Sequence, residues 1–257
     1  MIREITSKEY HMLKDLLLRD IARNYFLLLG ISGTRDVYDK IYGEFHKGRL
    51  KAVLFKRKTG VLQFYAPGDF DLIHFVDLIK SLDYNSLIGP ESYCDNFLNK
   101  GIFKRFEEGA YLSKLKNNHK VIININKYNI RFITLEDLDL IVELYKEVFK
   151  SFAPKEVMEK KLSEKRGRGV CIEIGGKIVS VAQSDFETEG GAVIVGVATS
   201  KNYRGKGMGT ECLRFLCTTL QKEGKDLFLQ YNNLDAEGIY DKLGFKKFDQ
   251  VIHYFKE

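Results

Sequence analysis

The chain has 257 residues, of which 44% are hydrophobic and 12% aromatic, so it can form one large or two small globular domains. Its net charge is +6, but acids are interspersed among the lysines, as in 154–166, which indicates a solvated amphipathic helix and argues against nucleic-acid binding. With no apolar run of about 18 residues and no apolar core of a signal peptide near Met1, we expect no membrane span and a cytoplasmic protein.

The first half predicts helices and strands in a mixed order. A Thr cap precedes an amphipathic helix, and Thr59-Gly60 forms a turn between two apolar strands. In order, we expect a short strand and cap at 2–9, a helix to about residue 29, strands at 50–57 and 61–66, a helix at 70–82, a strand at 86–89 and a further helix.

The second half predicts a clearer series. Apolar side chains recur at helical spacing after Thr134, and Gly175-Gly176 forms a hairpin turn between two strands. In order, we expect a short strand and cap at 130–137, helices at 135–150 and 154–165, strands at 169–174, 177–186 and 192–199, a helix from Met208 that Gly224 closes, and a strand at 226–231.

An internal echo predicts two domains, 1–120 and 128–257. The opening Ile2-Arg-Glu-Ile-Thr6 returns as Ile130-Arg-Phe-Ile-Thr134, each followed by an acid three residues after the threonine. We place the hinge between about residues 110 and 128. The apolar run 121–125 within it is an alternative: a strand that pairs across the two halves.

A glycine-rich segment, Arg204-Gly-Lys-Gly-Met-Gly-Thr210, follows the apolar strand at 192–199. Its glycines permit positive φ and close approach of a ligand to the backbone. The next helix offers free N–H groups and a partial positive charge at its start, beside the formal charges of Arg204 and Lys206. This combination predicts a pyrophosphate-binding loop.

Two other phosphate-binding motifs fit the segment poorly. A dinucleotide-binding fingerprint needs Gly-x-Gly-x-x-Gly early in the chain, whereas these glycines are spaced Gly-x-Gly-x-Gly and lie late in it. A Walker A loop needs Ser or Thr after its lysine, whereas Gly207 follows Lys206.

Together with Asn233, Tyr240 and Gly244-Phe245, this segment resembles the GNAT superfamily of acyl-CoA-dependent N-acetyltransferases. The signature of that family is Arg/Gln-x-x-Gly-x-Gly/Ala followed by an Asn…Tyr…Gly-Phe helix. The resemblance implies an α/β (α+β) fold of two GNAT-like mixed-sheet halves with helices on both faces. The first half is degenerate, because nothing in it matches Arg-Gly-x-Gly. In the second half, the parallel strands 192–199 and 226–231 would splay apart.

The resemblance also implies which residues bind acetyl-CoA. The backbone N–H of Val197 would face the thioester carbonyl, and Thr199 the pantetheine amides. The full set of implied coenzyme-binding residues is Val197, Ala198, Thr199, Arg204, Gly205, Lys206, Gly207, Met208, Gly209, Thr210 and Asn233. Asn233 is also the expected cap of the last helix.

Acetyl transfer to an amine needs a polarised carbonyl, a deprotonated amine and a protonated leaving thiolate. By resemblance, Tyr240 is the acid, and its usual pKa of about 10 keeps its proton available. Some relatives place a glutamate base where this chain has Gly191. Glu187 and Glu189 are therefore the candidate bases, with a chain of water molecules as the alternative.

Covalent and metal-dependent chemistry find little support in the sequence. Cys212 and Cys217 lie within the helical apolar pattern and are expected to be core thiols, while Cys94 and Cys171 have no Cys-x-x-Cys companion. The five histidines are scattered without ligand spacing. We therefore expect a reducing environment and no metal.

The expected function is transfer of an acetyl group from acetyl-CoA to a primary amine, by direct attack in a ternary complex. The alternative is a sensor or interaction module that binds acyl-CoA without turnover, and a third option is transfer of an aminoacyl or longer acyl group. The acceptor is a small-molecule or peptide amine, and a homo-oligomer is compatible with the sequence. The first half shapes the amine pocket, forms a dimer face or only adds core.

Overall fold

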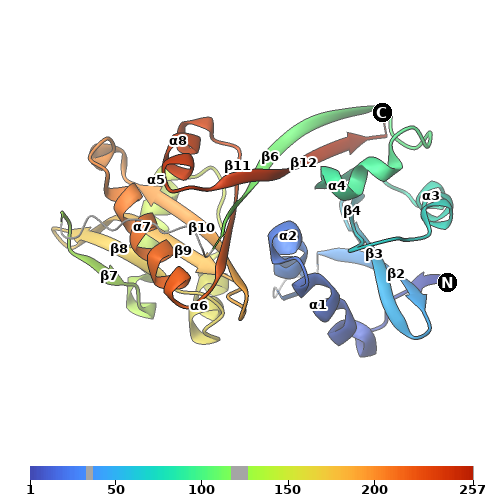
Figure 1. The fold of residues 1–257 in the computed structure, drawn as a ribbon, viewed down its shortest axis with the longest axis horizontal. Coiled ribbons are helices and arrows are strands. Elements are labelled where there is room, and N and C mark those ends of the chain that lie inside the picture. Colours follow the sequence, from blue (N-terminus) through green and yellow to red (C-terminus); the bar gives the residue numbers. More distant parts are fainter. Residues whose placement is uncertain (33–36, 117–126, 257) are drawn as a thin grey trace. The chain divides into compact units, whose positions relative to one another are not determined.

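The structure is a computed structural model that describes residues 1–32, 37–116 and 127–256. The chain forms two compact units, one of residues 1–112 with 247–257 and one of residues 113–246 (Figure 1). The C-terminal segment thus belongs to unit 1 by its contacts, although it follows unit 2 in the chain. The domains 1–120 and 128–257 stay a prediction, and the strand considered at 121–125 lies outside the described residues.

Unit 1 is a mixed sheet with helices on both faces. Its strand order is β1-β2-β3-β4-β5-β12-β6. The elements are β1 (Ile2–Glu4), α1 (Tyr10–Leu18), α2 (Ile21–Ser32), β2 (Tyr38–His46), β3 (Arg49–Arg57), β4 (Val61–Tyr65), α3 (Leu72–Ser81), β5 (Ser86–Pro90), α4 (Glu91–Cys94), β6 (Arg105–Leu115) and β12 (Lys246–Phe255). Strand β12, red in Figure 1, lies beside β6.

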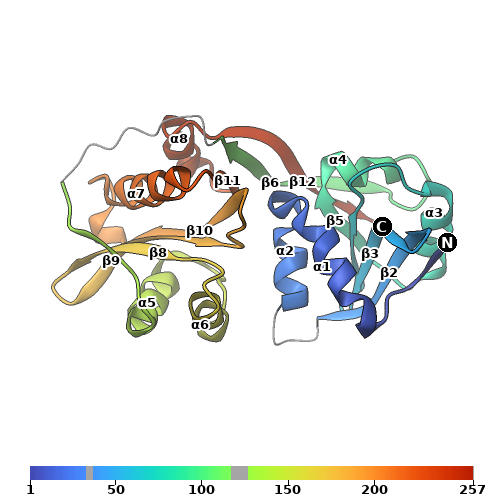
Figure 2. The same cartoon turned by 60° about the horizontal axis from the view of Figure 1, so that its bottom comes forward.

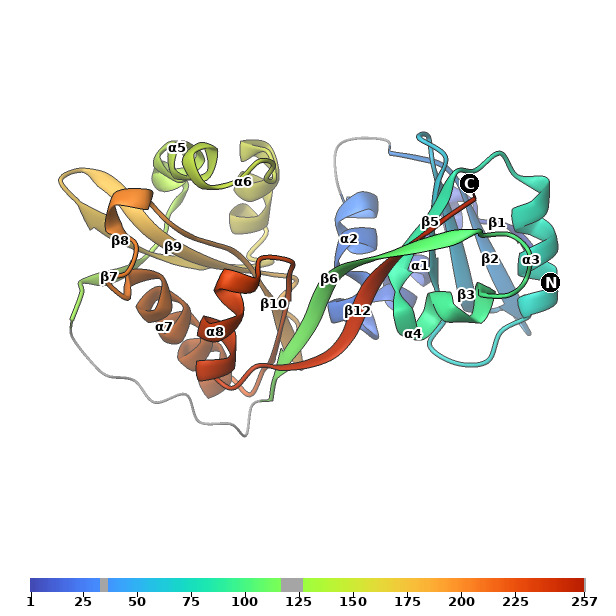
Figure 3. The same cartoon turned by 90° about the horizontal axis from the view of Figure 1, so that it is seen from above.

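Two apolar layers hold unit 1 together. Buried Leu54, Phe64 and Phe75 belong to a core between the sheet and α3, which also takes Ile252 and Tyr254 from β12. Helix α1 packs on β3 at the other face, so α1 and α3 lie on opposite sides of the sheet (Figures 2 and 3).

The single helix expected before residue 29 is wrong, because the structure breaks it into α1 and α2. Asp20 lies at the break, and its Oδ1 accepts a hydrogen bond from the Arg23 N–H at 3.1 Å. The same carboxylate also pairs with the Arg23 guanidinium at 2.8 Å. This local capping satisfies donors at the start of α2, so a second helix begins there in a new direction.

Unit 2 contains the strands β11-β10-β9-β8-β7 in that order, with the end of β6 beside β11. Its elements are β7 (Ile130–Phe132), α5 (Leu138–Val148), α6 (Lys155–Ser163), β8 (Gly169–Ile174), β9 (Lys177–Asp185), β10 (Gly191–Thr199), α7 (Met208–Lys222), β11 (Asp226–Tyr231) and α8 (Leu234–Lys242). Helix α7 covers one face, while α5 and α6 cover the other (Figure 2). The mixed α/β fold predicted from the sequence is confirmed.

The capping motif predicted for both halves is confirmed. Thr6 and Thr134 each lie two residues after a short strand and begin a capping box with an acid three residues on. In each half an arginine of the strand also pairs with that acid: Arg3 with Glu9, and Arg131 with Asp137. The same local motif therefore opens both units.

None of the helices in the described part of the chain is both long and apolar enough to cross a membrane.

Candidate active site

Strands β10 and β11 begin as a parallel pair and then separate. Their ladder registers Gly191–Ile194 against Asp226–Leu229, and it stops there although β10 continues to Thr199. On its other edge, β10 pairs with β9, with a register shift between Val195 and Ala198. The backbone of β10 beyond Ile194 is thus the part of the sheet that can pair with an extended ligand.

Gly196 forms the bulge within that register shift. Its φ is 59°, and a Cβ built on it would collide with the hydroxyl of Tyr145. That hydroxyl donates a hydrogen bond to the Gly196 carbonyl oxygen at 2.8 Å. The bulge turns the next residue, the half-buried Val197, out of the regular β9–β10 ladder.

The glycine-rich loop has the conformation that the sequence predicts. Gly205 and Gly207 have φ of 74° and 84°, and Gly207 occupies the left-handed position directly before α7. A Cβ on either glycine would meet open space, so backbone conformation rather than crowding requires glycine there. At Gly209 the constraint is contact, because a Cβ would lie 2.7 Å from the Thr199 Oγ1.

The loop is exposed, positively charged and braced from several sides. Arg204 donates from Nε to the Thr199 carbonyl at 3.2 Å, which ties the loop to the end of β10. The hydroxyl of Tyr128 donates to the Lys206 carbonyl at 2.5 Å. Glu147 accepts from the Lys201 N–H at 2.6 Å, and this bond lowers the pKa of its carboxyl. The loop directly before α7 therefore faces solvent with its two cationic side chains, Arg204 and Lys206.

Tyr240 lies in α8 with its ring packed between Tyr231 and Phe245, at centroid distances of 5.0 and 6.1 Å. Burial raises the pKa of its hydroxyl to about 12, with the neighbouring Tyr231 adding to the shift. The hydroxyl therefore keeps its proton throughout the neutral range. Asn233 directly precedes α8, and its carbonyl accepts from the Ala236 N–H at 3.1 Å.

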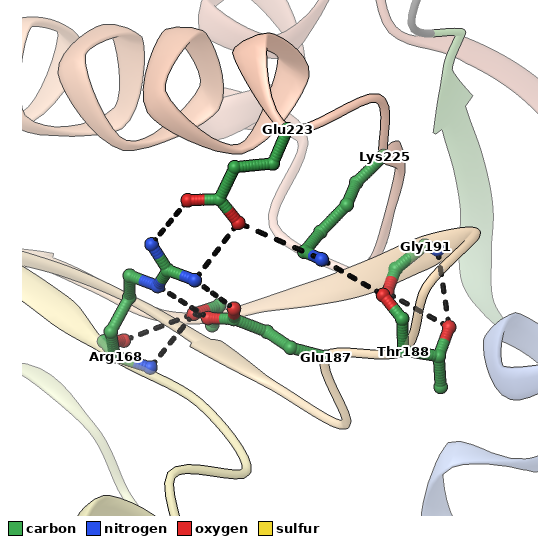
Figure 4. Close-up of polar contacts among 7 residues, drawn as sticks. Arg168, Glu187, Thr188, Gly191, Glu223 and Lys225 are labelled. Carbon is green, nitrogen blue, oxygen red and sulfur yellow. Dashed lines mark hydrogen bonds and ion pairs between the residues drawn. The ribbon is translucent and has the colours of Figure 1, made fainter.

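The two predicted base residues, Glu187 and Glu189, lie in the turn between β9 and β10. Figure 4 shows Glu187 and its polar contacts. The Glu187 carboxylate accepts from Arg168 at 2.6 and 3.1 Å and from the Ser184 hydroxyl at 2.5 Å. Arg168 also pairs with Glu223, at 2.6 Å, at the end of α7. Glu187 is thus held in an ion-pair network, whereas Glu189 is exposed at the tip of the turn.

The same network fixes the start of β10. Lys225 donates to the Thr188 carbonyl at 2.9 Å, and the Thr188 hydroxyl accepts from the Gly191 N–H at 3.1 Å. Figure 4 shows these bonds together around the turn. Gly191, the position at which the resemblance would place a glutamate base, is buried and brings no side chain.

Several polar residues near the bulge were missed by sequence reasoning. Tyr145 and Gln183 are buried around the Gly196 carbonyl, and Lys161 is buried behind them. The one available signal was the run of polar side chains in the otherwise apolar β9, namely Ser180, Gln183, Ser184 and Asp185, all of which are buried. From the sequence, Tyr145 was predicted only to be part of the apolar face of α5.

Unit 1 also contains a parallel pair of strands, β4 and β5, with α3 between them. The start of α3 differs from that of α7, because side chains cap it. Asp71 caps α3 with its own side chain, accepting from the His74 N–H at 3.2 Å. The Glu44 carboxylate accepts from the Asp71 N–H at 2.9 Å. Carboxylates thus hydrogen-bond the backbone N–H groups at this helix start.

Among the residues that the structure describes, no group of three or more His, Cys, Asp or Glu side chains is arranged to hold a metal ion. All four cysteines are free and buried.

The second half of the chain matches one family of known proteins. Residues 137–245 match the family model described as the acetyltransferase (GNAT) family. No curated protein matches the sequence of the chain.

Solved structures share the fold over nearly the whole chain at low identity. An acetyltransferase from the GNAT family of Colwellia psychrerythraea has a TM-score of 0.71 at 14% identity, covering 99% of both chains. A tandem GNAT protein from the clavulanic acid biosynthesis pathway has a TM-score of 0.66 at 11% identity, covering 99% of this chain and 97% of that one. A GCN5-related N-acetyltransferase from Sphaerobacter thermophilus has a TM-score of 0.64 at 11% identity, covering 99% and 94%.

Proposed function

Residues 137–245 belong to the GNAT family of acetyltransferases, and on this premise we propose that the chain transfers an acetyl group from acetyl-CoA to a primary amine. Three features carry the proposal. A bulge lies at Gly196, Gly205 and Gly207 have left-handed backbone conformations, and no side chain in the described part of the chain caps the start of α7. These features lie in chain order along one strand–loop–helix unit. Acetyl-CoA carries its thioester, pantetheine arm and pyrophosphate in the same order, so the coenzyme matches these three features.

The coenzyme would bind with its pyrophosphate on the loop 204–210. The N–H groups at the start of α7 and the charges of Arg204 and Lys206 would balance its negative charge. The pantetheine arm would pair with the free edge of β10 at Val197, Ala198 and Thr199. This arrangement leaves the thioester beside the bulge.

The reaction would then proceed by direct attack. The amine nitrogen bonds to the thioester carbon, the carbonyl oxygen gains negative charge near the Val197 N–H, and the carbon–sulfur bond breaks. The Tyr240 hydroxyl, the assigned acid, donates a hydrogen bond to the leaving sulfur, which departs as the thiolate. Because the pKa of Tyr240 is raised to about 12, its hydroxyl is a weaker acid than a thiol, whose pKa is about 8.5, so it acts by hydrogen bonding and keeps its own proton.

A proton must also leave the attacking amine. Glu187 is held by Arg168 and Ser184, so its carboxylate is not free to move toward an amine. Glu189 is exposed and stays a candidate base. We propose that water carries this proton to solvent, with Glu189 as the alternative base.

The second candidate function is a module that binds acyl-CoA without turnover. Gly191, where some relatives place a base, is the observation that favours it. The two functions differ in one observable: only a transferase releases free coenzyme A thiol when an amine is added.

Calorimetric titration with acetyl-CoA tests the coenzyme site. We expect saturable binding of one molecule per chain, lost in Gly207→Val because valine resists a φ of 84° at the start of α7. The matched control is Gly224→Val, which introduces the same strain into open space at the other end of α7. Binding that Gly207→Val retains in full would contradict the assigned site.

A further inference from the structure

Three consecutive hydrogen bonds connect α6 to the bulge of β10. The Lys161 Nζ donates to the Gln183 Oε1 at 2.5 Å, and the Gln183 Nε2 donates to the Tyr145 hydroxyl at 2.7 Å. Tyr145 in turn donates to the Gly196 carbonyl at 2.8 Å. The three side chains come from three different elements, α6, β9 and α5, and meet only in the folded unit.

All three side chains are shielded from water. Lys161 and Tyr145 are each 3% exposed, and Gln183 is 1% exposed. The rings of Phe149 and Phe152 flank Tyr145 at centroid distances of 5.1 and 5.5 Å. In such surroundings each polar atom needs a defined partner, because one left without a partner is costly.

The lysine sets the direction of the whole chain of bonds. A protonated amine can only donate, so it must face the oxygen of the Gln183 amide. The amide nitrogen then faces Tyr145 and donates to its hydroxyl oxygen. The single hydroxyl proton of Tyr145 is thereby left for the Gly196 carbonyl.

The bulge needs this support because its geometry is unusual. Gly196 has a positive φ, and the ladder to β9 shifts register around it, so regular sheet pairing does not hold it. The Tyr145 hydroxyl occupies the space where a Cβ would stand and fixes the carbonyl at that point. The peptide that follows carries the Val197 N–H.

We propose that Tyr145 and Gln183, oriented by Lys161, are positioning residues that hold the β10 bulge so that the Val197 N–H meets the carbonyl oxygen of the acyl thioester. This inference rests on the proposed acyl-transfer activity. It assigns to three buried side chains a role that acts through the backbone and requires no contact with either substrate.

Two substitutions remove the bond to the Gly196 carbonyl in different ways. Tyr145→Phe deletes the donor. Gln183→Glu keeps the size of the side chain but replaces the amide donor by an acceptor, so the carboxylate competes with the Gly196 carbonyl for the Tyr145 proton. Because the two changes break the same bond, combining them should lower the rate no further than either alone.

The kinetic test compares these variants with wild type, using acetyl-CoA and an accepted amine well below the melting temperature. We expect kcat to fall about tenfold in each, with KM for acetyl-CoA within about twofold of wild type. This is less than the roughly hundredfold or larger loss that follows removal of an oxyanion donor itself. The control is Tyr84→Phe, which deletes a buried tyrosine bond of the same kind, to the Ile102 carbonyl at 2.7 Å, in unit 1.

A second readout observes the bulge itself. In amide NMR spectra, Tyr145→Phe and Gln183→Glu should both shift the resonances of Gly196 and Val197 while leaving that of Gly224 in place. Unchanged bulge resonances, or an unchanged kcat in both variants of an active enzyme, would overturn the positioning role alone. A wild-type protein that transfers no acetyl group would instead overturn the proposed function, and this role with it.

Discussion

At the scale of single residues, the Tyr240 hydroxyl is the assigned acid of the reaction. If it donates its hydrogen bond to the leaving sulfur, Tyr240→Phe should lower kcat about a hundredfold, at the lower end for general acids, with the Kd for acetyl-CoA nearly unchanged. Because burial raises the pKa of Tyr240 to about 12, its ionisation should cause no loss of rate up to about pH 10. A pH profile of kcat measures both effects. Full turnover by the phenylalanine variant at every pH would exclude the assigned acid role.

The burial of Lys161 should make the stability of the protein depend on pH. Burial lowers its pKa from 10.5 to about 8, against the opposing effect of Asp185, with Arg166 and Glu187 also contributing. Between these values the unfolded chain binds more protons than the folded one, so stability rises with pH. The cost of the buried charge is complete below about pH 8 and disappears by about pH 10.5.

Urea unfolding of wild type and Lys161→Met measures this effect. The stability of wild type relative to the variant should rise by about 3 kcal/mol, or less, from pH 7 to pH 10.5. Lys160→Met is the control, since it removes an exposed charge from the neighbouring position of α6. An equal pH dependence in all three proteins would show that Lys161 is not buried in its charged form.

At the scale of elements, the loop and the start of α7 should act together as an anion site. Arg204→Glu places a negative charge beside the pyrophosphate position, so we expect the Kd for acetyl-CoA to increase at least about tenfold. Lys222→Glu makes the same charge change in the last turn of α7 and should alter the Kd much less. Titration with acetyl-CoA at two salt concentrations tests whether the effect is electrostatic. Added salt screens charges, so the difference in Kd between wild type and Arg204→Glu should become smaller. Equal losses in both variants would contradict a local anion site.

Local chemistry explains which elements could be predicted from the sequence. The loop from Arg204 to Thr210 was predictable because positive φ needs glycine at fixed positions. The hairpin at Gly175-Gly176 and the Thr-capped helices depend on equally local signals. The break at Asp20 was missed, because apolar periodicity continues through it and only the capping contact to Arg23 marks it.

Other parts depend on contacts between distant segments. Strand β12 pairs with β5, from Val251 opposite Pro90 to Phe255 opposite Ser86, and no local pattern specifies that partner. The network of Lys161, Gln183 and Tyr145 is likewise assembled from separate elements. For the base, sequence offered Glu187 by position alone, while its pairing with Arg168 depends on the folded turn.

At the scale of the whole molecule, the C-terminal strand is structurally part of the first unit. Ile252 and Tyr254 are buried in the unit 1 core, and Asp249 pairs with Arg23 and accepts from the Ser92 hydroxyl at 2.6 Å. A chain ended at Lys246 should therefore lose the folded structure of unit 1, since removing each large core side chain alone costs about 2–5 kcal/mol.

Near-ultraviolet circular dichroism and thermal unfolding of this truncated chain measure the loss. Removing only Lys256 and Glu257 is the control and should leave the melting temperature within a few degrees of wild type. Adding a peptide of residues 246–257 should restore structure to the truncated chain. A truncated chain that melts like wild type would show that unit 1 folds without β12.

Acetyl transfer to an amine is the proposed function of this chain. The most direct measurement is release of free coenzyme A thiol from acetyl-CoA over a panel of small-molecule and peptide amines, with wild type beside Tyr240→Phe and Gly207→Val. We predict amine-dependent release by wild type, much slower release by Tyr240→Phe, and none by Gly207→Val. Saturable binding of acetyl-CoA without thiol release for any amine would contradict the transferase and favour the binding module.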